Sequence, residues 1–412
     1  MSGCGCDTQK QQALMPVAEA LNAMLELAQV SKNHVDLAVE SALGRVLAED
    51  VYSSVDVPPQ DNSAMDGYAL NAASLEQGKR FYISQRIPAG VAPQLLEVGT
   101  AARIFTGSEI PPGADAVEMQ ENTVSGEDEQ GVWVEFKEPV RSGANIRPKA
   151  QDIASGQVVM KAGTRLLAAH LGVLASVGVA NVKVVQPLTV AILTTGDELV
   201  MPGSPLQPGQ IYNSNLFTLK GLLQGLGLNI LDLGTVEDTF EATEAALLKA
   251  ANGADCIISS GGVSVGEEDH VKAAVEKLGK LNLWKMAIKP GKPLAFGEVA
   301  GTPFIGLPGN PASVFVTFAI LARSYLLKSQ GATEFLPQIF KVAAGFNRTK
   351  AISRQEYLRV ELDAGKACLS RSQSSGILSS AASAAGFMIV PCDTQVVEGQ
   401  FYDFIPLSEV LN

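Results

Sequence analysis

Glycines, hydroxyls and carboxylates crowd into one short stretch of the sequence, SSGGVSVGEEDH at residues 259–270. The stretch follows an apolar run and precedes a helical pattern, so its glycines expose backbone N–H groups that can form a nest for an anion. The donors on offer are Ser259, Gly261, Gly262, Ser264 and Gly266. Their spacing imitates a P-loop, but Glu267 stands where that motif requires lysine, so a Walker-type nucleotide site is rejected.

Carboxylates follow apolar runs in other places as well. TTGDEL supplies Thr195, Gly196 and Glu198, and GTVED supplies Asp238. Asp269 follows the glycine-rich stretch. Acids beside a phosphate repel it unless a divalent cation lies between them, and Mg²⁺ binds one or two carboxylates together with phosphate oxygens. A phosphate and Mg²⁺ site is therefore predicted, against the alternative that Asp269 only caps its own helix.

Basic residues gather in the segment LWKMAIKPGKP, residues 283–293. On a single strand Lys285, Ala287 and Lys289 share one face, and Lys292 follows a glycine turn. These lysines predict a local basic patch in an acidic protein. The alternative is a solvated edge strand that carries lysines as protection against edge pairing.

The elements that must position these residues alternate from residue 187 onward. TVAILTTG, LNILDLG and DCIISSGG are predicted strands separated by predicted helices, and a helix over PASVFVTFAILARSYLLK closes the set. Continuous apolar strands alternating with helices imply a doubly wound, mainly parallel sheet covered on both faces. Ligands of such sheets bind outside the carboxyl ends of the strands. One more such end, GLPGNP, offers Asn310 as the cap of a helix that starts at Pro311.

The rest of the chain shows other hydrophobic patterns. Residues 11–50 carry helical stripes, residues 53–147 form short β-like runs between Pro/Gly turns, and short strands return after residue 332. Residues 148–186 mix both patterns and are expected to pack back on the first helices. We therefore predict a discontinuous linker domain (1–52 and 148–186), a small β-rich domain (53–147), the α/β domain (187–331) and a C-terminal β domain (332–412).

A second dense polar stretch, DVPPQDNSAMDGYAL at residues 56–70, contains Asp61 and Asp66. RIFTGS adds Thr106. A bland surface turn would explain the prolines and polar residues. Residue patterns alone do not bring this stretch to the predicted site of residues 187–330.

Composition narrows the class of protein. The net charge of −12 and the pI near 4.9 disfavour nucleic acid or an anionic membrane surface as partner. No uninterrupted apolar run is long enough for a membrane helix, and the N-terminus lacks a secretory signal pattern. Five cysteines in 412 residues make no disulfide framework, and three histidines without ligand spacing argue against a zinc enzyme. A cytoplasmic protein is expected.

Many motifs together resemble one family. DNSAMDGYA, RIFTGSEIPPGADAV, SGANIR, TTGDELV, GQIYNSN, SSGGVSVGEEDH, WKMAIKPGKP and GLPGNPASV resemble the molybdopterin molybdenumtransferases, called MoeA in bacteria. The C-terminal region of gephyrin belongs to the same family. The resemblance covers nearly the whole chain after about residue 10.

The resemblance implies a reaction and an assembly. Molybdate would be inserted into adenylated molybdopterin, with Mg²⁺-dependent hydrolysis and release of AMP. The soft dithiolate ligand comes from that substrate, so no protein cysteine site is needed and Cys256 would be structural. The last domain would be a β-barrel, and an elongated homodimer would form its site between the α/β domain of one subunit and the small domain of the other. Molybdopterin adenylyltransferase and molybdoenzyme maturation proteins are implied partners.

The family's functional residues carry over onto matching positions. The implied catalytic residues are Asp61, Glu198, Asp238, Asp269, Lys285 and Lys289, of which Glu198, Asp238 and Asp269 are the metal candidates. The implied substrate-binding residues are Thr106, Thr195, Gly196, Ser259, Gly261, Gly262, Ser264, Gly266, Pro308, Asn310, Pro311 and Ser313. RQEYLR and SSGILSS match the family more loosely and add the oxyanion candidates Arg354, Arg359, Ser375 and Ser379. A further departure is Ala150, where many relatives carry glycine.

Two alternatives remain beside a molybdenum insertase. A molybdopterin adenylyltransferase shares the SSGG-type loop, but it lacks the DNSAMDGYA domain and the C-terminal domain that are both present in this sequence. A gephyrin-like scaffold without catalysis is opposed by the intact set of acids and by the lack of a receptor-binding insertion.

Overall fold

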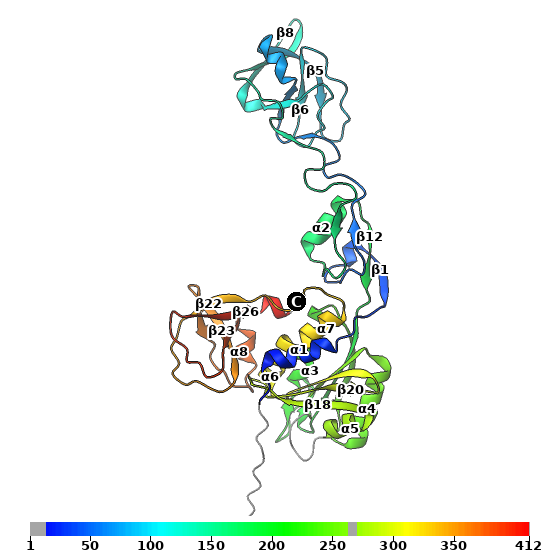
Figure 1. Cartoon of the computed structure of the whole chain (residues 1–412), viewed down its shortest axis with the longest axis vertical. Coiled ribbons are helices and arrows are strands. Elements are labelled where there is room, and N and C mark those ends of the chain that lie inside the picture. Colours follow the sequence, from blue (N-terminus) through cyan, green and yellow to red (C-terminus); the bar gives the residue numbers. More distant parts are fainter. Residues whose placement is uncertain (1–13, 263–269, 412) are drawn as a thin grey trace, which may run out of the picture.

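The computed structural model describes residues 14–262 and 270–411 of the chain. The molecule is elongated, with a small β-rich domain at one end of its long axis and a linker domain in the middle (Figure 1). The α/β domain and a C-terminal β-barrel share the other end (Figure 1). The chain is therefore a multidomain α/β plus β protein, as the sequence predicts.

A six-stranded sheet forms the centre of the α/β domain, in the order β16-β13-β17-β21-β20-β18. The strands span Asn229–Val236 (β16), Thr189–Thr195 (β13), Cys256–Ser260 (β17), Thr302–Leu307 (β21), Pro293–Val299 (β20) and Gly279–Lys285 (β18). The first four are parallel and the last two join antiparallel. The prediction of a mainly parallel sheet is confirmed.

Helices cover both faces of this sheet. They are α3 (Ser214–Gly225), α4 (Phe240–Gly253) and α5 (His270–Leu278), followed by α6 (Pro311–Thr317) and α7 (Arg323–Ser329). Alternate residues of β13 face opposite sides, so Val190 and Ile192 pack with α3 and α6 while Ala191 and Leu193 pack with α4 and α5. The doubly wound arrangement is thus present.

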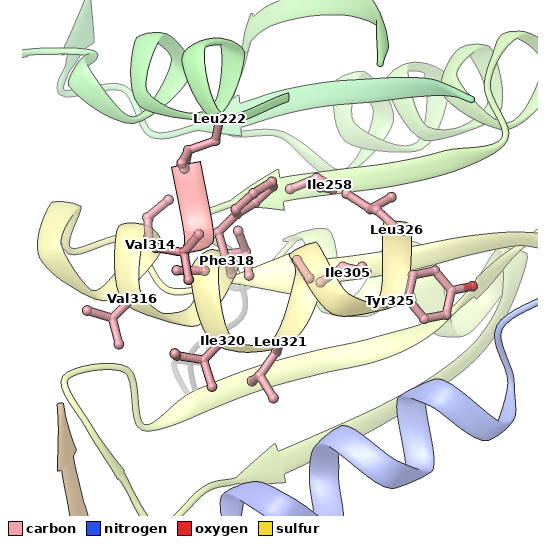
Figure 2. Close-up of a cluster of buried hydrophobic side chains, with 14 of the residues drawn as sticks. Leu222, Ile258, Ile305, Val314, Val316, Phe318, Ile320, Leu321, Tyr325 and Leu326 are labelled. Atoms are coloured by element: carbon pink, nitrogen blue, oxygen red, sulfur yellow. The ribbon is translucent and has the colours of Figure 1, made fainter. Parts of the chain in front are cut away.

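The last helical segment runs through the core. A π-helical turn over Phe318–Ala322 joins α6 to α7. Figure 2 shows Val314, Phe318 and Leu326 of this segment close to Leu222 of α3 and to Ile258 and Ile305 of the sheet. Within the described part of the chain, Pro311–Ser329 is the one helix long and apolar enough to span a membrane, but 94% of its apolar window is buried inside the protein. It is the core helix that the sequence predicts.

The linker domain is built from two separated stretches of chain. Strand β1 (His34–Ala38) pairs with β12 (Asn181–Val185), and β2 (Val51–Tyr52) pairs with β11 (Val158–Met160). Helix α2 (Ala168–Ser176) packs beside them. The prediction of helix through residue 50 was wrong, because α1 ends after Val17–Glu26 and the chain then continues as β1. Pairing with a strand nearly 150 residues away overrides the local helical pattern.

The small domain is a six-stranded sheet in the order β7-β4-β6-β5-β9-β8. Its strands are β4 (Gly67–Leu70), β5 (Arg80–Ile87), β6 (Thr100–Ile104), β7 (Ala116–Met119), β8 (Thr123–Asp128) and β9 (Gly131–Phe136). A short pair, β3 (Asn62–Ser63) with β10 (Ile146–Arg147), lies where the chain enters and leaves. The stretch DNSAMDGYA therefore runs from this entrance into the sheet.

Five strands of the C-terminal domain close into a barrel, because β23 pairs with both β24 and β25. The strands are β22 (Phe340–Ala344), β23 (Gln355–Asp363), β24 (Lys366–Leu369), β25 (Gly386–Val390) and β26 (Phe401–Pro406). Two short helices, α8 (Ser379–Ala382) and α9 (Ser408–Leu411), complete it. The barrel implied by the resemblance is present.

The lysine segment divides between two sheets. β18 ends at Lys285, while β19 (Ile288–Lys289) pairs in parallel with β23 of the barrel. The prediction of one strand with Lys285 and Lys289 on one face was wrong. Met286, Ala287 and Ile288 are all buried, which a half-exposed strand with alternating faces does not allow.

Two arginines of the linker domain hold the carboxyl end of α3. Arg45 donates from Nη1 to the Gly227 carbonyl oxygen at 2.7 Å, and Arg165 donates from Nη2 to the Gly225 carbonyl oxygen at 3.1 Å. Cations are favourable there because the last carbonyls of a helix are unpaired and carry partial negative charge. Burial lowers the pKa of the Arg165 guanidinium. These contacts connect the linker domain to the α/β domain.

We expect the double variant Arg45→Gln with Arg165→Gln to loosen the linker domain from the α/β domain, since both contacts to α3 are lost. Small-angle X-ray scattering should then give a broader distribution of interatomic distances. Arg80→Gln is the matched control, because Arg80 lies over Trp133 inside the small domain. An unchanged distribution in the double variant would show that other contacts set the position of the linker domain.

Candidate functional site

A cavity of about 1200 Å³ opens at the carboxyl ends of β13, β17 and β21. One part of its wall comes from the loops that follow these strands and from the start of α3. Another part comes from residues 289–293 and from Arg354 and residues 373–375 of the barrel. The cavity is thus a site between two domains of the same chain, at the edge where open α/β sheets bind ligands.

The structure brings most of the sequence-predicted residues to this cavity. Those that line it are Thr195, Gly196, Glu198, Asp238, Gly261, Gly262, Lys289, Pro308, Asn310, Pro311, Ser313, Arg354 and Ser375. They come from segments far apart in sequence, so their meeting is a result of the fold.

Other predicted residues lie elsewhere. Ser259 is buried within β17, Lys285 is exposed at the end of β18, and Ser379 begins α8, so none of them lines the cavity. Arg359 is buried in the barrel. Ser264, Gly266 and Asp269 lie outside the described residues.

The amino end of α3 forms one wall. The buried side chain of Asn213 caps this helix, because Oδ1 accepts from the Leu216 N–H at 3.2 Å. Its Nδ2 donates to the hydroxyls of Thr194 at 2.7 Å and Thr235 at 3.0 Å. The cap therefore locks the start of a 12-residue helix to the ends of β13 and β16. Unpaired N–H groups at such a helix start favour an anion.

Bare backbone forms the neighbouring wall. Gly261 and Gly262 have φ of 91° and 65°, a region that favours glycine. A Cβ atom on Gly262 would lie 2.3 Å from Cγ2 of Val271. Asn215 ties this loop to the next, since its Nδ2 donates to Ser260 Oγ at 2.9 Å and to the Gly309 carbonyl oxygen at 2.7 Å. Gly261 and Gly262, the described glycines of this stretch, thus line the cavity with backbone that has no room for a side chain at Gly262.

Charges of both signs line the cavity. Glu198 follows β13 and Asp238 follows β16, while Lys289, Lys292 and Arg354 line another part of the cavity. Two carboxylates beside backbone donors match the oxygen ligands that Mg²⁺ takes together with phosphate. Among residues 14–262 and 270–411, no group of three or more metal-binding side chains gathers. Glu198 and Asp238 are the carboxylates among the described lining residues that could hold a cation.

A barrel loop completes the site, and Arg359 holds it. Arg359 donates from Nη2 to the carbonyl oxygens of Ser372 at 3.2 Å and Ser374 at 3.0 Å. The Ser375 carbonyl oxygen accepts from the Ala312 N–H at 2.9 Å, which connects the loop to α6. Burial lowers the pKa of the Arg359 guanidinium. Arg359 therefore positions residues that line the cavity and does not line it itself.

Sequence reasoning missed several lining residues. They are Tyr212, Asn213, Ser214, Asn215, Gln373 and Ser374. The rule for helix caps could have found Asn213, since it stands directly before the predicted helix. The same rule was wrong for the side chain of Asn310, which makes no capping hydrogen bond although α6 does begin at Pro311.

Asp61 directly precedes β3 and Thr106 follows β6, so both belong to the small domain, which lies at the other end of the long axis from the α/β domain (Figure 1). Asp61 Oδ1 accepts from the Lys149 N–H at 2.7 Å. Thr106 donates from its N–H and its hydroxyl to Asp66 Oδ1 at 2.7 and 2.8 Å, and these hydrogen bonds lower the pKa of Asp66. These residues cannot reach the cavity of their own chain.

Cys256 begins β17 at the end of the sheet opposite to the cavity. Its side chain is buried, and burial raises the pKa of the thiol to about 12. The thiolate, which is the form that binds metals, is therefore disfavoured at this position. The expectation that this cysteine is structural agrees with its place in the core.

Three family patterns match successive parts of the chain. The MoeA N-terminal region (domain I and II) matches residues 15–178, a probable molybdopterin binding domain matches residues 191–328, and the MoeA C-terminal region (domain IV) matches residues 341–407. The cavity lies between the second and third of these regions.

Whole proteins are similar over most of their length. The molybdopterin molybdenumtransferase of Haemophilus influenzae is 42% identical over 84% of this chain and 85% of its own. That of a Nostoc species is 39% identical over 73% of this chain and 70% of its own. A crystal structure of the molybdopterin biosynthesis MoeA protein of Pyrococcus horikoshii OT3 is 28% identical, covers 96% of this chain and all of its own, and superposes with a TM-score of 0.81.

We expect Asn213→Ala to lower the free energy of unfolding by about 2 kcal/mol, because the helix cap and two side-chain hydrogen bonds are lost together. Chemical denaturation measures the change. The matched control is Asn229→Ala, since Asn229 donates a single exposed hydrogen bond to the Pro187 carbonyl oxygen. Equal losses in the two variants would contradict the role of Asn213 as the anchor of α3.

Proposed function

The chain belongs to the MoeA family of molybdopterin molybdenumtransferases, and from this premise we propose how its cavity works. The protein is a transferase that inserts molybdenum into molybdopterin in the biosynthesis of the molybdenum cofactor. We propose that its substrate is adenylated molybdopterin, that molybdate is the second substrate, and that Mg²⁺-dependent hydrolysis releases AMP. One observation supports this: a single cavity between two domains has a phosphate-type wall, with backbone donors and carboxylates, and a cationic wall, with Lys289, Lys292 and Arg354.

The phosphate-type wall would hold the pyrophosphate linkage of the adenylated substrate. The N–H groups at the start of α3 and that of Gly262 are donors suited to phosphate oxygens, whereas the Gly261 N–H already donates to the Leu307 carbonyl oxygen at 3.2 Å. Glu198 and Asp238 would hold Mg²⁺ beside it, and that cation would neutralise charge developing on the phosphate oxygens. Asp269 remains a further predicted ligand.

The cationic wall would hold molybdate. Lys289, Lys292 and Arg354 supply positive charge, and Ser375 supplies a hydroxyl from the barrel loop. A tetrahedral dianion needs several donors that converge from different directions. The two walls belong to one cavity, so molybdate would lie beside the dithiolene of the bound substrate.

A homodimer would bring Asp61 to this site. Asp61 is exposed on the small domain, and the elongated shape keeps that domain away from the cavity of its own chain (Figure 1). A second copy could present its small domain there, which would complete the catalytic set with Asp61 and Thr106. Molybdopterin adenylyltransferase and molybdoenzyme maturation proteins would be partners in a cytoplasmic pathway.

We expect the purified protein, given adenylated molybdopterin and Mg²⁺, to release AMP faster when molybdate is added. Asp238→Asn should slow this release about tenfold or more, because a carboxylate beside the phosphate is lost. Asp403→Asn is the control, since Asp403 pairs with Lys341 on the barrel surface. Release that ignores molybdate would argue against insertion, and normal release by Asp238→Asn would remove that residue from the site.

Mixed dimers test the shared site. Asp61→Ala and Asp238→Ala should each abolish turnover in homodimers, whereas a dimer with one change on each subunit should recover one intact site. AMP release by purified mixed dimers measures the recovery, with about half of the wild-type rate expected if the two sites work independently. A mixed dimer as inactive as either homodimer would show that the small domain does not serve the partner subunit.

A further inference from the structure

Glu356 is a buried carboxylate directly behind the cationic wall of the cavity. It lies on β23 of the barrel, and its side chain is 1% exposed. Its Oε1 accepts from Lys289 Nζ at 3.1 Å, and its Oε2 accepts from Nη2 of Arg348. One carboxylate therefore holds two cations, one of which lines the cavity.

Strand pairing brings Lys289 and Glu356 next to each other. Lys289 and Glu356 are direct partners in the parallel pairing of β19 with β23. Arg348 is fixed from the other side, because its N–H and its carbonyl oxygen both pair with Val396. The carboxylate is thus held by its own strand and by two neighbouring elements.

The net charge of Glu356, Lys289 and Arg348 determines which kind of ligand they favour. A buried carboxylate is stable only when it is paired, and Glu356 satisfies this with one oxygen for each cation. Two cations against one anion leave an excess of one positive charge. Lys289 is the partner that carries this charge to the cavity, because its side chain is 39% exposed and lines it, while that of Arg348 does not line it.

The other cations of the wall are held differently. Arg354 donates from Nη1 to the Ile288 carbonyl oxygen at 3.5 Å, and Lys292 makes no ion pair with any described residue. A free lysine samples many rotamers and loses that freedom when it binds an anion. Lys289 has already lost this rotamer freedom through its ion pair with Glu356.

We propose that Glu356 is a positioning residue of the oxyanion subsite, which fixes the ammonium of Lys289 at the cavity wall before the ligand arrives. The inference rests on the proposed function, because it takes the oxyanion to be molybdate. The carboxylate itself does not touch the ligand. It acts through Lys289, and it keeps β19 joined to the barrel.

Lysine labelling tests the contact itself in the full-length protein. In Glu356→Gln, Lys289 loses its carboxylate partner and should react with acetic anhydride about threefold faster, relative to Lys285 and Lys292 in the same peptide segment. Mass spectrometry of the peptides measures all three rates. The matched control is Glu298→Gln, which breaks an exposed pair with Lys280. Equal rates in wild type and Glu356→Gln, or a joint rise of all three lysines, would overturn the proposal.

Glu356→Asp provides a second variant if the amide prevents folding. The shorter acid keeps the charge but cannot span both cations, so faster labelling of Lys289 is expected here as well. Unchanged labelling in this variant would count against the positioning role.

Turnover shows whether the effect passes through Lys289. Glu356→Gln should lower molybdate-dependent AMP release about tenfold, while the affinity for AMP stays unchanged. In a Lys289→Ala background the same substitution should cause no further loss. A further tenfold loss there would show that Glu356 acts by another route. If wild-type AMP release ignores molybdate, the proposed function fails, whereas the labelling result still decides whether Glu356 fixes Lys289.

Discussion

The cavity depends on one detour of the chain between two domains. After β18 the chain leaves the α/β sheet, adds β19 to the barrel, and returns as β20. The return passes through Gly291, whose φ is 109° and where a Cβ atom would lie 2.4 Å from Cγ2 of Thr317. Only glycine fits at this point. The detour places Lys289 and Lys292 in the same cavity as the strand ends and joins the barrel to this segment.

Buried polar groups hold the residues that would meet a ligand. Asn213 fixes the start of α3, Arg359 fixes the barrel loop, and Glu356 fixes Lys289. Each makes hydrogen bonds to neighbouring elements, so each lowers the freedom of a lining segment. A site of this kind is arranged before its substrate enters, which limits the cost of ordering on binding.

The linker domain and the small domain together form an arm that extends from the α/β domain (Figure 1). Arg45 and Arg165 hold the linker domain on the carboxyl end of α3, while the amino end of the same helix lines the cavity. One helix therefore contacts the linker domain at its carboxyl end and lines the cavity at its amino end. In the small domain at the tip, Thr106 donates two hydrogen bonds to Asp66, and Asp61 is exposed.

The sequence by itself determined the alternation of strands and helices, and it predicted a glycine-rich anion nest and acids at the strand ends, because these follow from local periodicity and from backbone freedom at glycine. The motifs also identified the family. Only the tertiary structure separated Lys285 from Lys289, buried Arg359 behind the site and paired Glu356 with Lys289. The physical reason is that β19 pairs with residues about 67 positions later in the chain, and no local pattern records a pairing at that distance.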